Sequence, residues 1–155
     1  FRSRMMGSFG FGTLHGSLAE RVSLYPPEVI AAAVRNVKNY KTYRHLLSQH
    51  CYHLTSAEHS DGWQGMQFAA RDRSEAVVFL FRNGSETTAR RFVLRGLEPL
   101  RRYTITHLNT GATETAEGAA LMQAGIEAVL ASEPQESEIL VLKAQGSTPE
   151  TAAAR

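Results

Sequence analysis

The hydrophobic pattern of the chain changes near residue 50. Between residues 27 and 48, apolar side chains recur at helical spacing and form one stripe, while charged side chains lie mostly elsewhere. Prolines at positions 26 and 27, followed by an acidic residue in the first turn, are typical of a helix start. The pattern therefore predicts one long helix over residues 27–48. The members of the stripe are Ile30, Ala33, Val34, Val37, Tyr40 and Leu47.

From Cys51 onward the period is two, which is typical of β-strands. Short runs rich in β-branched and aromatic residues alternate with turn-forming residues, and this favours an antiparallel β-sandwich over residues 51–144. Residues 145–155 lack an apolar pattern and are expected to form a flexible tail. The predicted turns lie at Asp61-Gly62, Asp72 to Ser74, Asn83-Gly84, Gly96 to Pro99 and Asn109 to Gly111.

The segment before the helix mixes small, apolar and aromatic residues. Met5, Met6, Phe9 and Phe11 fit a short buried strand over residues 3–11, followed by a glycine-rich turn. Residues 1–48 then form one unit of strand, loop and helix, as at the end of a barrel built from β/α units. The expected fold is mainly β, with a C-terminal antiparallel sandwich preceded by one strand and one long helix.

Composition excludes several classes of protein. The 155 residues and 43% hydrophobic content suit one domain, or one domain plus a remnant. The net charge of +2, without a run of five like charges, argues against nucleic-acid binding. No apolar run approaches the roughly 20 residues that span a bilayer. The single Cys51 cannot form an internal disulfide. These features leave the compartment open, with a slight preference for the cytoplasm, and we expect no cofactor.

Two clusters with candidate chemistry have simpler explanations. The glycines between Gly10 and Gly16 lack the spacing of a dinucleotide-binding loop and favour a tight turn or a loop that a neutral ligand approaches closely. Four histidines, at positions 45, 50, 53 and 59, surround Cys51. However, residues 50 and 53 of a strand point to opposite faces, and no known metal-binding spacing accompanies them. We therefore expect no metal site.

Catalytic residues are also not expected in this chain. Its only aspartates, Asp61 and Asp72, lie in predicted turns, and no serine has the context of an activated nucleophile. Four aromatic residues could offer a stacking platform for a sugar, although aromatics in alternating strands more often lie in a core. The four are Tyr52, Trp63, Phe68 and Phe81.

Several strings along the chain carry a further signal through their order and spacing. Together they resemble the C-terminal end of the melibiase type of α-galactosidase, glycoside hydrolase family 36, over residues 2–143. The strings are Met5-Met-Gly-Ser-Phe-Gly-Phe-Gly12, Tyr40-Lys-Thr-Tyr-Arg-His-Leu-Leu47, Trp63-x-x-Met-Gln-Phe68, Ser74-Glu-Ala-Val-Val-Phe-Leu-Phe81, Leu94-Arg-Gly-Leu-Glu-Pro-x-x-Arg-Tyr103, Gly118-Ala-Ala-Leu-Met-x-x-Gly-Ile126 and Ser137-Glu-Ile-Leu-Val-Leu142.

The resemblance implies a parent enzyme with a (β/α)8 barrel and two catalytic aspartates located before this chain begins. Residues 2–12 would be the last barrel strand and its loop, residues 27–48 the last barrel helix, and residues 51–143 the C-terminal domain. No catalytic residue can be assigned to any position here. Active sites of such barrels lie at the strand ends, which leaves four substrate-side candidates. These candidates are Gly7, Ser8, Phe9 and Gly10.

The sequence thus favours a catalytically silent C-terminal part of an α-galactosidase-like glycoside hydrolase. Its partner would be the rest of the barrel, and the substrate of the parent would be an α-galactoside. Two alternatives stay open, namely a carbohydrate-binding sandwich and a protein-interaction domain that uses the helix. The stripe at Ile30, Val34, Val37 and Tyr40 is expected to pack against the sandwich or a second copy of the chain, because an apolar helix face needs a partner.

Overall fold

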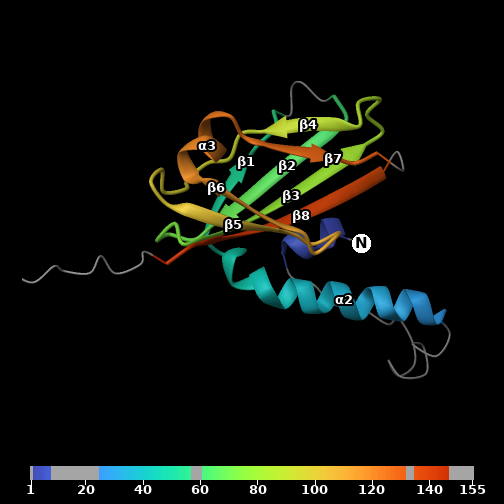
Figure 1. Ribbon diagram of the computed structural model, residues 1–155. Coiled ribbons are helices and arrows are strands. Elements are labelled where there is room, and N and C mark those ends of the chain that lie inside the picture. The colour runs from blue at the N-terminus through green and yellow to red at the C-terminus, as the bar shows by residue number, and fades with distance from the viewer. Residues whose placement is uncertain (1, 8–24, 57–60, 132–134, 147–155) are drawn as a thin grey trace, which may run out of the picture.

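Two antiparallel sheets stack face to face, and a long helix runs along the outer side of the larger sheet (Figure 1). The computed structural model describes residues 2–7, 25–56, 61–131 and 135–146. Its helical elements are η1 (Arg2–Met6), α2 (Pro27–Tyr43), η2 (Arg44–Leu46) and α3 (Gly118–Gln123). Its strands are β1 (His50–His53), β2 (Trp63–Ala69), β3 (Glu75–Asn83), β4 (Ala89–Phe92), β5 (Arg102–His107), β6 (Thr113–Glu117), β7 (Ile126–Val129) and β8 (Gln135–Ala144).

The larger sheet has the strand order β1-β2-β3-β8-β5-β6, and β4 pairs with β7 in the smaller sheet. The central strand β3 pairs with β2 over seven positions and with β8 over nine. Its sequence explains this place, because Ala76 to Leu80 are all buried and a strand that is covered on both faces is apolar throughout. The mainly β, antiparallel fold class expected from the sequence is confirmed.

Alternating residues of the larger sheet build two separate cores. One face packs against the smaller sheet and α3, and its buried residues include Trp63, Val78, Tyr103 and Leu140. The opposite face carries a second cluster, which is covered by the N-terminal segment and the end of the helix. The buried members of this second core are Met5, Tyr43, Leu46, Phe68, Val77, Phe79, Ile139 and Val141.

Helix α2 begins at Pro27, as the sequence predicts, with Glu28 in its first turn. Its α-helical part ends at Tyr43, where the backbone leaves helical geometry, and a 3-10 turn continues to Leu46. This tighter turn brings both Tyr43 and Leu46 into the second core. The predicted extent of residues 27–48 is therefore nearly right, but its last turn is not α-helical.

The strand predicted over residues 3–11 is wrong where the structure describes it, because residues 2–6 form the 3-10 helix η1. Neither sheet includes this segment among its strands, and a strand without a neighbour leaves its backbone groups unpaired. A 3-10 turn pairs some of these groups locally and still buries Met5 completely. Residues 8–11 lie outside the described part of the chain.

Candidate functional site

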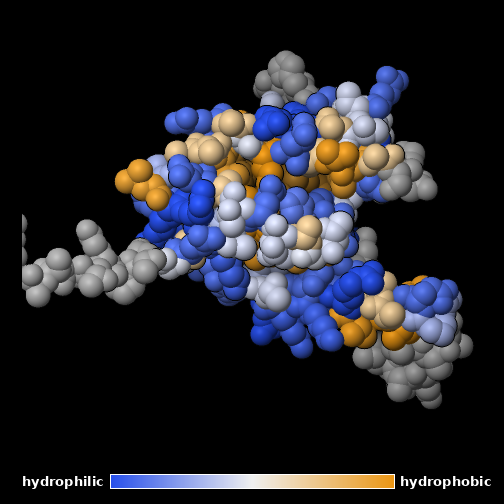
Figure 2. All heavy atoms as spheres, in the orientation of Figure 1, coloured by the Kyte–Doolittle hydropathy of each residue, from blue (hydrophilic) through white to orange (hydrophobic). Residues whose placement is uncertain are grey.

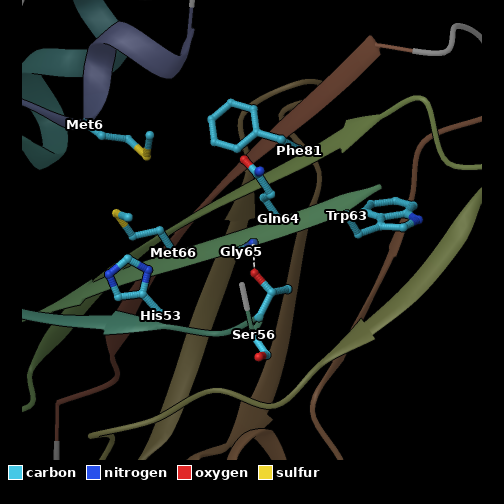
Figure 3. Close-up of a pocket in the computed structure, with 9 residues that line it drawn as sticks. Met6, His53, Ser56, Trp63, Gln64, Gly65, Met66 and Phe81 are labelled. Atoms are coloured by element: carbon cyan, nitrogen blue, oxygen red, sulfur yellow. Dashed lines mark hydrogen bonds between the residues drawn. The ribbon is translucent and has the colours of Figure 1, made fainter. Parts of the chain in front are cut away.

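A hollow of about 350 Å³ opens on the larger sheet between η1 and the neighbouring ends of β1, β2 and β3. Figure 3 shows Met6 on one side of it, Met66 and His53 together on the other, and the amide of Gln64 directed toward Phe81. The described residues that line it are Met6, His53, Thr55, Ser56, Trp63, Gln64, Gly65, Met66 and Phe81.

The lining of this hollow mixes apolar side chains with the polar side chains of His53, Thr55, Ser56 and Gln64. Its described residues include no carboxylate, lysine or arginine, so the two carboxyl groups that a glycosidase uses cannot be formed from them. Trp63 is only 1% exposed and belongs to the first core, where its indole N–H donates to the Thr87 carbonyl oxygen at 3.1 Å. The hydroxyl of Thr55 accepts a hydrogen bond from the Gly65 N–H at 3.3 Å. The hollow has room for a small ligand, but its described lining lacks the paired carboxyl groups of glycoside hydrolysis.

Of the four predicted substrate-side residues, the structure describes only Gly7. Gly7 is exposed, and its carbonyl oxygen accepts a hydrogen bond from the Tyr40 hydroxyl at 2.9 Å. This bond ties the N-terminal segment to helix α2. Ser8, Phe9 and Gly10 lie outside the described residues, so their placement at a substrate stays a prediction.

The histidines do not assemble a metal centre in the described part of the chain, where no three His, Cys, Asp or Glu side chains come together in a way that could hold an ion. His45 contacts the Glu75 carboxylate at 2.7 Å. His50 and His53 lie at the two ends of β1, and His59 is outside the described residues. Although Cys51 is exposed, desolvation raises the pKa of its thiol, which disfavours the reactive thiolate.

The two aspartates act in turns, as predicted. Asp72 accepts hydrogen bonds from the hydroxyl and the backbone N–H of Ser74, at 2.7 and 3.0 Å, and these bonds lower its pKa. Asp61 accepts the Trp63 N–H at 3.1 Å and pairs with Arg90. The aspartates flank opposite ends of β2, a span of roughly 20 Å at strand spacing. A retaining glycosidase needs its carboxyl groups about 5 to 5.5 Å apart, so this pair cannot do that chemistry.

A polar cluster that the sequence did not indicate lies where β5, β6 and β8 meet. Glu138 is 8% exposed and accepts hydrogen bonds from the backbone N–H groups of Ile139 and Asn109, at 2.8 and 3.1 Å. His107 lies 3.0 Å from the Glu114 carboxylate and 3.9 Å from that of Glu138. Burial raises the pKa of Glu138. The cluster fixes the turn after β5, and only the cross-strand register, which is not a local signal, brings its members together.

The four aromatic residues considered for sugar stacking do not form one exposed platform; Trp63 and Phe81 both line the hollow, but Trp63 is only 1% exposed. Tyr52 and Trp63 pack in or against the first core, whereas Phe68 and Phe81 belong with the second. They therefore lie on opposite faces of the larger sheet. In the described residues, Tyr25 is the one aromatic side chain among the large apolar groups that are strongly exposed.

Comparison with known proteins gives a consistent picture. A model of the family "Glycosyl hydrolase family 36 C-terminal domain" matches residues 63–142. Among curated protein sequences, none matches at a significant level.

In the described residues, no helix combines the length and the apolar character that crossing a membrane requires.

Solved structures of α-galactosidases are similar to this chain. AgaA from Geobacillus stearothermophilus is 26% identical with a TM-score of 0.69, and AgaB from the same organism is 27% identical with a TM-score of 0.68. Each comparison covers 80% of this chain but only 17% of the enzyme. The α-galactosidase from Lactobacillus brevis, at 24% identity and a TM-score of 0.66, shares the fold over 81% of this chain and 18% of its own.

The family match covers just over half of the 155 residues and includes both strands of the smaller sheet. Its limits coincide with the first residue of β2 and with Leu142 in β8, so it spans the part of the chain that forms the first core. The chain therefore belongs to glycosyl hydrolase family 36 and carries the C-terminal domain of that family.

Proposed function

We propose that this chain is the C-terminal part of an α-galactosidase-like glycoside hydrolase, in which it supports a catalytic barrel and contributes no catalytic carboxylate. The similar enzymes are much longer, since the matched region is 17 to 18% of their chains. These enzymes are α-galactosidases, which makes an α-galactoside the substrate class we propose for the parent.

The observation that carries the supporting role is the uncovered apolar surface of α2. Val34, a member of the stripe, is 51% exposed, and Val29, which lies outside the stripe, is 44% exposed, while Tyr40 and Tyr43 at the other end of the helix pack on the sheet. The stripe was expected to pack on the sandwich or on a second copy of the chain. Within this chain Val34 is exposed whereas Ile30 and Val37 are half-buried, and packing on a second copy stays a prediction. Figure 2 shows hydrophobic residues gathered on the part of α2 that extends past the sheet. An apolar helix face of this kind is suited to packing against another helix.

We take the occupant of this surface to be the preceding part of the parent chain. The last helix of a barrel packs on its neighbouring helix as well as on the barrel strands, which matches a helix that contacts its own sandwich only at one end. A carbohydrate-binding role is less well supported, because the aromatic side chains that it needs are divided between two faces.

Two measurements test this proposal. The first is an assay of the purified chain with a chromogenic α-galactoside, for which we expect no turnover above background. Appreciable turnover that persists after a second purification would contradict the absence of catalytic groups.

The second measurement compares Val34→Glu with Ala31→Glu in the full-length hydrolase that contains this domain. Both positions are exposed on α2, but Ala31 lies outside the apolar stripe. We expect Val34→Glu to lower the thermal midpoint of the enzyme by a few degrees, on the order expected for about 1 kcal/mol, and Ala31→Glu to leave it nearly unchanged. Equal effects of the two substitutions, or no effect of either, would show that the stripe is not a contact with the barrel.

A further inference from the structure

The loop between β4 and β5, residues 93–101, is held by side chains from the interior. The amide of Gln67, which is fully buried, donates to the Arg95 carbonyl oxygen at 2.5 Å and accepts the Arg95 N–H at 2.9 Å. The buried Tyr103 hydroxyl accepts the Glu98 N–H at 2.9 Å and donates to the Arg73 carbonyl oxygen at 2.5 Å. These bonds fix the loop and the neighbouring β2–β3 turn relative to each other.

Glycine packing adds a further constraint on the same loop. Gly118 lies so close to the Glu98 carbonyl oxygen that a Cβ at this position would be 2.1 Å from it. Gly96 has a φ of +63° and lies against the Tyr52 hydroxyl. A loop with this many specific contacts has little conformational entropy left to lose when it binds a partner.

This fixed loop presents an unusual combination of side chains. Leu100, at its tip, is 94% exposed. Exposed arginines lie in the same loop, at the start of β5 and in the β2–β3 turn, which contacts the loop through Arg73 with Glu98 and through the Asp72 carbonyl oxygen with Arg101. We refer to Arg71, Arg95, Leu100, Arg101 and Arg102 as the Arg-Leu surface. Figure 2 shows strongly hydrophilic residues gathered at this end of the sandwich, at the left of the view.

The arginines of this surface differ from those of β4 in their partners. On β4, Arg90 pairs with Asp61, and Arg91 lies 3.8 Å from the Glu127 carboxylate. On the Arg-Leu surface, Arg101 donates to the Asp72 carbonyl oxygen at 3.5 Å. Within the described ranges, Arg71, Arg95 and Arg102 form no ion pair with an acidic side chain. Their guanidinium groups are thus available to a partner.

We propose that the Arg-Leu surface is a docking site for an acidic surface of another protein, with Leu100 entering an apolar pocket between the partner's carboxylates. Guanidinium groups match carboxylates in a two-point geometry, and arginine is enriched in protein interfaces. A single exposed leucine is ordinary on a protein surface. Here it stands on a fixed loop among arginines without ion pairs, which is the arrangement of a prepared apolar anchor inside a polar rim.

The same surface is poorly suited to nucleic acid. Glu98 binds Arg73 at 3.3 Å, and Glu117 is the strand partner of Arg102, so negative charges are interspersed among the positive ones. A phosphate backbone needs a continuous basic track, and an aliphatic anchor gains nothing from phosphates. The surface is also separate from the α2 stripe, and its test does not depend on the function proposed above.

The experiment is a selection of a random 12-residue peptide library, displayed on phage, against the purified chain. We expect the enriched peptides to combine aspartate or glutamate with a patch of apolar residues. Amide chemical shifts of the chain, followed during titration with one enriched peptide, should change in residues 71–73 and 95–102. Enrichment without an acidic bias, or shifts that centre on α2 or on the hollow beside Met66, would overturn the proposal.

Variants make the test specific. Leu100→Ser and Arg101→Ala/Arg102→Ala should each weaken binding of the enriched peptide by about fivefold or more, as expected for residues that matter in an interface. Arg35→Ala/Lys38→Ala removes the same charge from exposed positions of α2 and should change affinity less than twofold. If this control variant lost as much affinity for the peptide as Arg101→Ala/Arg102→Ala, the binding would depend on net charge alone and the proposal would be contradicted. Displacement of the peptide by a 20-nucleotide single strand of thymidines at 150 mM salt would favour nucleic acid and contradict the proposal.

Discussion

The two faces of the six-stranded sheet are closed by different parts of the chain. The first core, between the sheets, has all its buried members within residues 63–142, the region matched by the family model. The second core uses the same strands but is closed by Met5, Tyr43 and Leu46, which precede that region. The region matched by the family model therefore supplies all the buried residues of the first core. The second core also needs η1, α2 and η2, the segments that we connect with the barrel.

The cores also differ in how completely their polar groups are paired. The Tyr103 hydroxyl in the first core makes two hydrogen bonds. The Tyr43 hydroxyl in the second core is buried and has no hydrogen-bond partner in the described residues. Burial raises its pKa well above the ordinary range. A buried hydroxyl without a partner is costly, so the second core is the less complete of the two.

The largest expected effect is the loss of the indole in the first core. Trp63 is 1% exposed, stacks edge-on with Phe92 at 5.8 Å, and donates to Thr87. Trp63→Ala should lower the free energy of unfolding by about 3–5 kcal/mol, as for other buried aromatic residues. Urea unfolding followed by far-ultraviolet circular dichroism measures this change, since the variant has no tryptophan fluorescence.

Val129→Ala is the control for this substitution. Val129 lies on β7 of the same sandwich but is 62% exposed, and its truncation should change stability by at most about 0.5 kcal/mol. If Trp63→Ala cost no more than Val129→Ala, the first core would not be the main source of stability.

Three tyrosines allow a finer comparison of the two faces. Tyr103→Phe removes a hydroxyl with two partners and should cost about 1–3 kcal/mol, because the Arg73 carbonyl and the Glu98 N–H lose it. Tyr43→Phe removes a hydroxyl that has no partner and should be neutral or slightly stabilising. Tyr40→Phe, which loses the exposed bond to Gly7, should lie between them.

Urea unfolding followed by Trp63 fluorescence suits all three variants, because they retain the indole. A clear loss of stability in Tyr43→Phe would show that this hydroxyl does find a partner, and the contrast between the faces would then be smaller than the structure indicates. In the full-length hydrolase the same substitution reports whether the barrel supplies that partner.

The sequence predicted those parts of the fold that depend on local signals. The start of α2 at Pro27 and the turns at Gly62, Gly84, Gly96 and Gly111 are confirmed, and each of these glycines has a positive φ. Only glycine adopts that backbone region readily, so its position is a strong local signal. The apolar runs likewise predicted strands at β2, β3, β5 and β8; burial alternates along β5, whereas the middle of β3 and of β8 is buried on both faces.

Elements without a local signal were missed. Strand β6 has the sequence Thr-Glu-Thr-Ala-Glu and is mostly exposed, so it carries no alternating apolar pattern. It is a strand because β5 beside it offers unpaired backbone groups. The 3-10 helix at residues 2–6 was missed for the opposite reason, since its apolar residues suggested a strand for which the fold provides no neighbour. The Glu138 cluster and the exposure of Val34 depend on tertiary packing that a single sequence does not show.

The smallest expected effect concerns Glu138, which lies in β8 near the point where η1 contacts that strand. Its side chain is buried beside His107. The carbonyl oxygen of the preceding residue, Ser137, accepts a hydrogen bond from the Arg2 guanidinium at 2.6 Å. Burial raises the pKa of Glu138 above 4.5, although the two backbone N–H bonds, His107 and Arg2 act in the opposite direction. The folded chain therefore holds this proton more tightly than the unfolded chain does. Stability from this group is present at low pH and is lost as the pH rises through the window above 4.5.

Glu138→Gln cannot titrate, so the stability of the wild type relative to this variant should fall as the pH rises above 4.5 and should stay constant once the carboxyl group of the folded chain is ionised. Urea unfolding at intervals of half a pH unit measures this difference in the free energy of unfolding. Both chains carry His107→Gln, so that titration of the imidazole does not contribute. If the wild type instead gained stability relative to Glu138→Gln with rising pH, the hydrogen bonds from Ile139 and Asn109 would outweigh burial. The carboxylate would then stabilise the turn after β5. The polar groups near Glu138 would in that case be as completely hydrogen-bonded as the Tyr103 hydroxyl in the first core.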